Sequence, residues 1–460
     1  MSRTGSKESL RQKLRDHFVP VDARLESTVT SCFHQQRNRR NEYIHLLWTC
    51  RALPPLRKTP APTMLFELKQ IARRQLEYMT LPRAAKAERR HDARGLSGRD
   101  PGIEAVETAA LGWLGDAQDF SATRDGGAAR DFDLLKGWAP SYPETSGYIV
   151  PTLIDSGLRR NEPILLDRAR RMIDWLVSIQ FAEGGFQGGT IGAEPRVPVT
   201  FNTGQILMGL AAARIQFGDR YDAPMHRAAG WLVDTMDADG CWRRFPTPFA
   251  APGEKAYETH VAWGLIEAAR ASEGTDRSRE YAEAALRNAR WAITKQLPNG
   301  WFESCCLSDP DAPLTHTIGY VLRGLTEIFL YTKDQDVLAA SLLTADALSA
   351  RVKDDGFLAG RLDREWNGVV DWVCVTGSAQ IAHSLLLLFQ ETGNPRYRDA
   401  AFALLRYARR TVHLDGPPGV RGGVKGSFPV DGGYGTYAFL NWAAKFLIDA
   451  GHAERLVRSA

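Results

Sequence analysis

Six segments of the chain share one pattern, a polar or small residue followed by threonine and then a long apolar stretch. Carboxyl, imidazole and amide groups occupy four of the six leading positions, and these groups can donate or accept protons and hydrogen bonds. If the threonines lie near helix starts, the leading residues face one common funnel. The six pairs are Glu144-Thr145, Asn202-Thr203, Glu258-Thr259, His316-Thr317, Val375-Thr376 and Gly435-Thr436.

The chemistry that these groups suggest is acid–base catalysis. Glu144 and Glu258 are candidates for the paired carboxyl groups of glycoside hydrolysis. Histidines in neighbouring repeats can move a proton at a uronic acid, and tyrosines can supply the complementary acid. The predicted catalytic residues are Tyr142, Glu144, Tyr148, Glu258, His260 and His316.

Aromatic and basic residues in the preceding loops predict the substrate-binding surface. Aromatic rings can stack on sugar rings, and arginine pairs with carboxylate or phosphate groups. The alternative is that the aromatic residues fill gaps between helices and that the cations belong to a solvated surface. The predicted binding residues are Trp138, Asn202, Gln205, Trp242, Arg243, Trp301, Tyr320, Arg364, Trp372 and Tyr437.

The elements that must position these residues are helices in a repeat. The threonines recur at intervals of about 56–60 residues, which fits two helices and two loops. Stretches such as ILMGLAAARI (206–215) are apolar on all sides and predict buried inner helices. Between them lie amphipathic helices that end in a glycine and an aromatic residue, and these predict an outer layer.

The pattern Trp175-Leu176, Gln180, Gly185-Phe186 resembles the repeat of the terpenoid cyclase and protein prenyltransferase toroid superfamily. Six-hairpin glycosidases, several polysaccharide lyases and sugar epimerases use the same α/α toroid. The resemblance covers roughly residues 105–455. It implies an all-α (α/α)6 toroid of six helical hairpins with an N-terminal helical extension, and it says little about the reaction because this fold hosts many.

Charge divides the chain at about residue 100. Residues 1–100 carry 21 Lys and Arg against 10 Asp and Glu, whereas the whole chain has a net charge of only +4. We predict a basic helical extension and linker over residues 1–100 and a catalytic toroid over residues 101–460. The basic part could contact an anionic partner, but a solvated arginine-rich extension is the favoured interpretation.

Other signals are absent. The six cysteines form no CxxC pair, so we expect free thiols and neither a metal site nor a cofactor. No apolar run reaches 18 residues and the N-terminus has no signal-like stretch, so we expect a cytoplasmic protein without a membrane span. No nucleic-acid partner is predicted, and the oligomeric state stays open.

These residues together predict a carbohydrate-active enzyme that acts on an anionic poly- or oligosaccharide. Hydrolysis, elimination and epimerisation stay open at this point. The alternatives are an isoprenoid cyclase or prenyltransferase and a non-catalytic binding module. The Asp-rich acid of the cyclases is missing from the six threonine positions, because Asp237 and Asp239 fall in a glycine-aromatic turn.

Overall fold

Helices dominate the computed structural model, which describes residues 78–460; residues 80–460 form one compact unit. Six inner helices alternate along the chain with six outer helices. The inner helices are α7 (Pro143–Arg160), α9 (Thr200–Phe217), α11 (Thr259–Ala271), α13 (Thr315–Thr332), α15 (Val375–Thr392) and α17 (Asn441–Ser459). The outer helices are α6 (Ile103–Asp119), α8 (Pro163–Ile179), α10 (Asp222–Thr235), α12 (Asp276–Ile293), α14 (Gln335–Ser349) and α16 (Pro395–Arg409).

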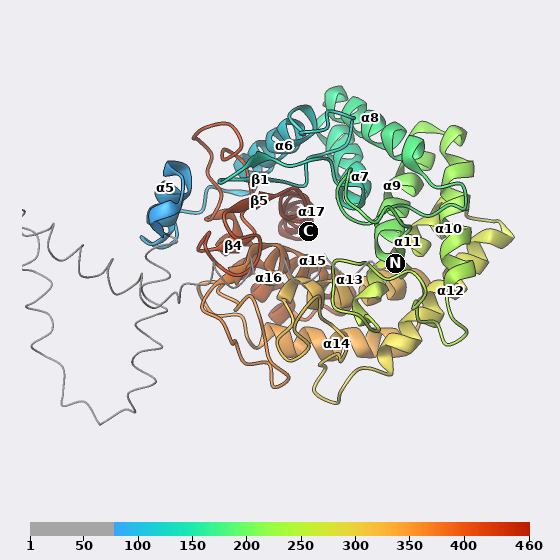
Figure 1. The fold of residues 1–460 in the computed structure, drawn as a ribbon. Coiled ribbons are helices and arrows are strands. Elements are labelled where there is room, and N and C mark those ends of the chain that lie inside the picture. Colours follow the sequence, from blue (N-terminus) through green and yellow to red (C-terminus); the bar gives the residue numbers. More distant parts are fainter. Residues whose placement is uncertain (1–77) are drawn as a thin grey trace, which may run out of the picture. The chain divides into compact units, whose positions relative to one another are not determined.

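The inner helices close into a ring. Each one packs against the next, from α7 through α9, α11, α13 and α15 to α17, and α17 returns to α7 (Figure 1). The outer helix α6 packs on α17, so the first and last hairpins join the two ends of the ring. The prediction of an (α/α)6 toroid is confirmed.

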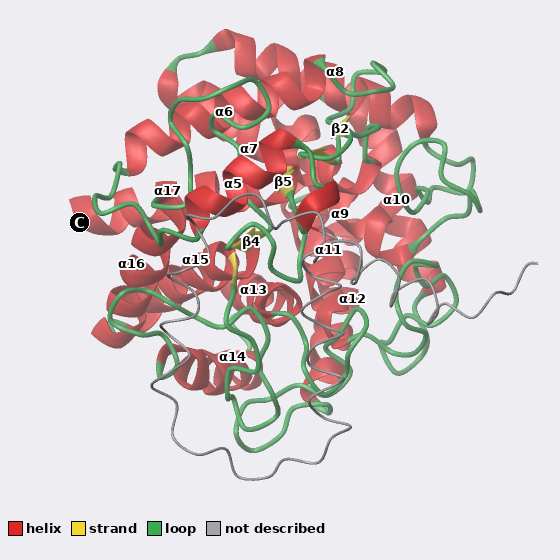
Figure 2. Cartoon of the chain, turned by 60° about the vertical axis from the view of Figure 1, so that its left-hand side comes forward, coloured by secondary structure: helices red, strands yellow, loops and turns green. Residues whose placement is uncertain are grey.

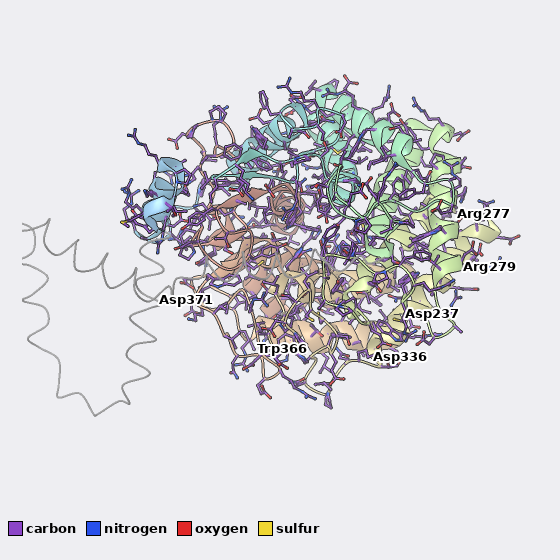
Figure 3. The ribbon with its side chains drawn as sticks, viewed as in Figure 1. Asp237, Arg277, Arg279, Asp336, Trp366 and Asp371 are labelled. Carbon is purple, nitrogen blue, oxygen red and sulfur yellow. The ribbon has the colours of Figure 1, made fainter. Side chains whose placement is uncertain are left out.

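Hydrophobic patterning explains which helices lie inside. In α9, every residue from Thr200 to Ala211 is buried, as expected for a helix covered on all sides. The outer helices bury one face and expose the other. Arg277 and Arg279 of α12 and Asp336 of α14 lie at the outer edge of the ring, pointing away from its centre (Figure 3).

The threonines do not act as N-caps, because no inner helix has a side-chain cap at its start. They lie within the first turn instead. The Thr203 hydroxyl donates to the Val199 carbonyl at 2.9 Å and accepts the Phe186 N–H at 2.9 Å, which ties the preceding loop to the helix. The sixth threonine, Thr436, is in a loop, and α17 begins five residues later at Asn441.

Short strands and turns lie in the loops at one rim of the ring. Strands β1 (Asp131–Asp133), β2 (Gly137–Trp138) and β5 (Ala438–Leu440) form an antiparallel sheet in the order β2-β1-β5, and β3 (Val373–Cys374) pairs with β4 (Ser427–Phe428) (Figure 2). The 3-10 helices are η2 (Asp219–Tyr221) and η3 (Ala256–Glu258). The loop before α9 contains a single bridge between Gln187 and Pro198.

An aromatic layer fills the centre of the ring. The His260 ring lies 4.4 Å from that of Tyr320, and Phe446 lies 5.3 Å from Tyr148 and 6.2 Å from Tyr320 between ring centroids. On the far side of this layer, the Lys445 ammonium lies 4.4 Å from the Phe446 ring. The layer separates two cavities, one at each end of the inner helices.

Helix α5 (Arg83–Asp92) precedes the ring and belongs to the same compact unit. The Lys425 ammonium, which is fully buried, pairs with Glu88 at 2.5 Å and with Asp92 at 2.6 Å. Most of the predicted basic extension lies outside the described residues, and the division at residue 100 stays a prediction. No helix among residues 78–460 is long and apolar enough to cross a bilayer.

Candidate functional site

A cavity of about 430 Å³ opens where the inner helices begin. Its lining combines eight aromatic side chains with a few groups that can exchange protons or hydrogen bonds. Among the described residues, Glu144 is the one carboxylic acid in this lining, Arg130 the one cation and His316 the one imidazole. The lining residues are Arg130, Tyr142, Glu144, Tyr148, Gly189, Thr190, Ala193, Phe201, Asn202, Thr247, Phe249, Ala250, Tyr257, Leu307, His316, Tyr320, Tyr434 and Trp442.

Glu144 lies in the first turn of α7, after Pro143, whose ring suits the first position of a helix. The Tyr142 hydroxyl donates to Glu144 Oε2 at 2.6 Å. Burial raises the pKa of Glu144 to about 7, although the Tyr142 hydrogen bond and the charge of Arg130 act in the opposite direction. A carboxyl group with this pKa is a proton donor over much of the neutral range.

His316 lies in the first turn of α13, and the neighbouring helix α15 fixes its ring. Its Nδ1 atom lies 2.8 Å from the side-chain amide oxygen Oε1 of Gln380, which can only accept a hydrogen bond. Nδ1 therefore carries the proton and Nε2 keeps its lone pair. Burial lowers the pKa of His316 to about 4, so the imidazole is neutral near pH 7.

Arg130 and Asn202 supply the other polar contacts of the cavity. The Arg130 side chain is half exposed, pairs with Asp131 at 3.2 Å and lies 5.8 Å from the Trp442 ring. The Asn202 side-chain amide nitrogen and the Tyr148 hydroxyl are buried, without a hydrogen bond within the described part of the chain. Buried polar groups without partners are costly, and a bound ligand could satisfy them.

The structure brings together six of the sequence-predicted residues. Glu144, His316 and Asn202 come from three different inner helices, and three tyrosines lie between them. The predicted residues in the lining are Tyr142, Glu144, Tyr148, Asn202, His316 and Tyr320.

Glu258, His260 and Gln205 lie outside the lining. Glu258 is buried within η3, and burial raises its pKa to about 8. His260 is covered by the aromatic layer, and its Nδ1 atom lies 2.6 Å from the Gln205 side-chain oxygen. The proposed carboxyl pair of Glu144 and Glu258 therefore does not face one cavity.

The remaining predicted residues near β-strands serve packing. Trp138 on β2 lies against Trp113 and Phe132, at 5.2 and 5.0 Å between ring centroids. Trp372 covers Gly360, where an added Cβ atom would lie 2.2 Å from its ring. Tyr437 has a positive φ of 60° in the loop before β5 and packs against the core.

The residues in the glycine-aromatic breaks also lie elsewhere, because these breaks fill the space between outer helices. Trp242 donates to the Leu232 carbonyl at 2.9 Å, and Trp301 packs on Trp366 at 5.1 Å. Arg243 pairs with Asp237, Asp239 and Glu254 at 2.6–2.9 Å, and Arg364 lies on the surface 3.6 Å from Glu303. These contacts agree with the alternative in which the aromatic residues fill gaps between helices and the arginines belong to the solvated surface.

Sequence reasoning missed several lining residues. Phe201 and Tyr257 lie one position before Asn202 and Glu258, so the repeat register carried a usable signal. The Ser146 hydroxyl accepts the Ala128 N–H in the same way that the Thr203 hydroxyl accepts the Phe186 N–H. Ser146, and not Thr145, is therefore the structural counterpart of Thr203, one residue away from the position that the threonine repeat predicts. Arg130 and Tyr434 come from loops, whose paths the repeat does not predict.

Comparisons with solved structures agree with the toroid fold. An unsaturated glucuronyl hydrolase specific for heparin matches with a TM-score of 0.62 and 16% identity, over 78% of this chain and 98% of the other. A sugar epimerase from a ruminal bacterium matches with a TM-score of 0.62 and 13% identity, over 76% and 97%. Cellobiose 2-epimerase from Spirochaeta thermophila matches with a TM-score of 0.60 and 16% identity, over 82% and 99%.

The protein is an α/α toroid with the fold of these sugar enzymes. No protein-family model and no curated protein matches the chain. The structural neighbours are carbohydrate hydrolases and epimerases, and at this identity the likeness establishes the fold of the toroid. The groups that line its cavity must therefore carry any argument about its reaction.

Proposed function

We propose that the toroid is a carbohydrate-active enzyme that transfers protons on an anionic sugar, with Glu144 as the acid and His316 as the base. The observation that carries this proposal is the opposed pKa shifts of two groups in one cavity, to about 7 for Glu144 and to about 4 for His316. Between these pH values the carboxyl group holds a proton while the imidazole can accept one.

Elimination and epimerisation both need this pair. In elimination, His316 removes the proton next to the sugar carboxylate, the bond to the leaving oxygen breaks, and Glu144 protonates that oxygen. In epimerisation, a proton is removed from one face of the carbon and another is returned to the opposite face. Arg130 would pair with the carboxylate in either reaction, and the aromatic lining supports an enzyme that stacks on sugar rings.

A second candidate is hydrolysis, which the acid Glu144 also supports. Glycosidases generally flank the scissile bond with two carboxyl groups. The described lining of this cavity contains one, so His316 would have to activate the water. This requirement makes proton transfer at carbon the better-supported reaction.

The test incubates the purified protein with acidic oligosaccharides in D₂O. Elimination produces unsaturated-uronate absorbance, epimerisation incorporates deuterium at carbon without new ends, and hydrolysis produces reducing ends without unsaturation. Glu144→Gln and His316→Ala should each lower turnover by about 100- to 10,000-fold, the usual contribution of a general acid or base, while the thermal midpoint stays near that of the wild type.

Glu258→Gln is the matched control, because Glu258 is also buried with a raised pKa but lies outside the lining. It should keep activity close to that of the wild type. Full turnover in Glu144→Gln or His316→Ala would remove that residue from the mechanism. Reducing ends as the sole product would favour hydrolysis.

A further inference from the structure

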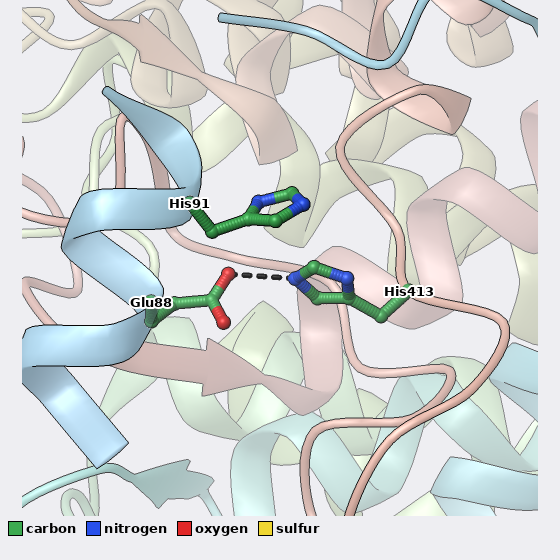
Figure 4. Close-up of side chains that lie close together, drawn as sticks. All are labelled: Glu88, His91 and His413. Atoms are coloured by element: carbon green, nitrogen blue, oxygen red, sulfur yellow. Dashed lines mark hydrogen bonds and ion pairs between the residues drawn. The ribbon is translucent and has the colours of Figure 1, made fainter. Parts of the chain in front are cut away.

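A cluster of metal-ligating side chains lies outside the sugar cavity, where α5 meets the loop after α16. Glu88 and His91 are three residues apart and share one face of α5. His413 reaches them from the loop, and one ligand atom from each of the three residues lies within 4.8 Å of the others (Figure 4). Two imidazoles and a carboxylate are a common ligand set for zinc.

The hydrogen bonds leave ligand atoms available. His413 Nε2 lies 2.7 Å from Glu88 Oε1, and the Lys425 ammonium lies 2.5 Å from the same oxygen. Both contacts use Oε1, so Oε2 remains for another cation. His91 Nδ1 lies 3.3 Å from Asp92 Oδ1, so within residues 78–460 its Nε2 is left for a ligand. A carboxylate on the second ring nitrogen is how proteins orient a metal-binding histidine.

The charges of the cluster are unbalanced. Glu88, Asp92 and Lys425 are 8%, 2% and 0% exposed, and together they carry one net negative charge when the histidines are neutral. Buried charge without compensation is unfavourable. The adjacent cavity of about 320 Å³ is lined by His91, His413 and Lys425, and it leaves room for an ion and its water.

We propose that Glu88, His91 and His413 bind one divalent transition-metal ion, for which Zn²⁺ is the probe. On binding, the ring proton of neutral His413 would move from Nε2 to Nδ1, so that Nε2, which now faces Glu88, could ligate the ion through its lone pair. The metal would join α5 to the loop after α16, beside the Lys425 ion pairs. The site is independent of the proposed sugar chemistry, since none of these residues lines that cavity.

The test uses the untagged full-length chain, stripped of metal with a chelator and titrated with Zn²⁺ against a chromogenic competitor. The wild type should bind one Zn²⁺ with micromolar or tighter affinity. His91→Gln and His413→Gln should each weaken binding at least about 10-fold, as expected when one of three protein ligands is lost. Zn²⁺ should also raise the thermal midpoint of the wild type more than that of His413→Gln.

His226→Gln is the matched control, because His226 also lies beside a carboxylate, Asp222, at 3.5 Å but outside the cluster. It should bind Zn²⁺ as the wild type does. No micromolar site in the wild type, or full affinity in both ligand variants, would overturn the proposal. Co²⁺ should give ligand-field bands without thiolate charge transfer, and a strong thiolate band would place the metal on cysteines and overturn it too.

Discussion

Two histidines of the inner ring are held in the same way and differ in what they can reach. His316 is hydrogen-bonded to the Gln380 side chain and lines the cavity. His260 is hydrogen-bonded to the Gln205 side chain and lies within the aromatic layer, outside the lining. Burial lowers the pKa of both imidazoles. Access to the cavity therefore distinguishes the candidate base from a packed core residue.

The pH profile should reflect His316 and Glu144. Activity should rise as pH increases through about 4, where His316 loses its proton, and fall through about 7, where Glu144 loses the proton that it must donate. In Gln380→Glu, the new carboxylate favours the imidazolium form, so the pKa of His316 and the acidic limb of kcat/KM should move to higher pH.

Gln205→Glu is the control for this shift, because it places the same carboxylate beside His260, outside the lining. Its active fraction should show the pH profile of the wild type. An acidic limb that stays in place in Gln380→Glu, or that moves equally in both variants, would contradict the role given to His316.

The residues in the first turns of the inner helices could be predicted from sequence. The sequence did not predict which of their side chains would face the cavity or how deeply each would be buried. Glu144 and His316 were found because polar residues precede apolar helices at regular intervals. Glu258 occupies the same sequence position but lies in a 3-10 helix, with its side chain away from the cavity. Arg130 could not be found, since tertiary packing rather than periodicity sets the path of its loop.

At the scale of the helices, glycines allow the inner ring to pack closely. A Cβ atom at Gly209 would lie 2.3 Å from the Gly147 carbonyl oxygen, and one at Gly264 would lie 2.4 Å from that of Gly204. The small residues of these helices were visible in the sequence and predicted burial. Which glycine meets which backbone depends on the helix–helix register, which the sequence pattern does not define.

Gly209→Ala should lower the free energy of unfolding by about 1–3 kcal/mol, because the added methyl group meets backbone that cannot move aside easily. Gly230→Ala on the outer helix α10 is the matched control, since a Cβ atom there meets nothing within 4 Å. It should raise stability by about 0.5–1 kcal/mol through helix propensity. Urea unfolding measures both changes, and equal effects would contradict the close-packing argument.

At the scale of the whole toroid, the last hairpin closes onto the first. Asn441 at the start of α17 donates to the Ala129 carbonyl and to the Thr145 hydroxyl, both at 2.8 Å. The sequence alignment placed the sixth repeat at Thr436 instead. The six-hairpin fold could be predicted from the repeat period, but the closing repeat departs from it because it must match the first hairpin.

Asn441→Ala should lower the free energy of unfolding by about 1–3 kcal/mol, since two buried acceptors lose their donor. Hydrogen exchange should show α7 and α17 losing protection together, although they lie about 300 residues apart in sequence. Asn367→Ala, at an exposed loop position, is the control and should change stability by less than about 0.5 kcal/mol. Loss of protection confined to α17 would argue against ring closure through this contact.

The aromatic layer across the ring closes the inner end of the cavity that Glu144 and His316 line. His260 and Phe446 pack between Tyr320 above and Lys445 below, and the cavities at the two ends of the inner helices share no lining residue. A polymer that entered could advance only until its leading unit met Tyr148 and Tyr320. Such a chain would be shortened or altered from its tip, one terminal unit at a time, and would have to back out through the mouth by which it came in.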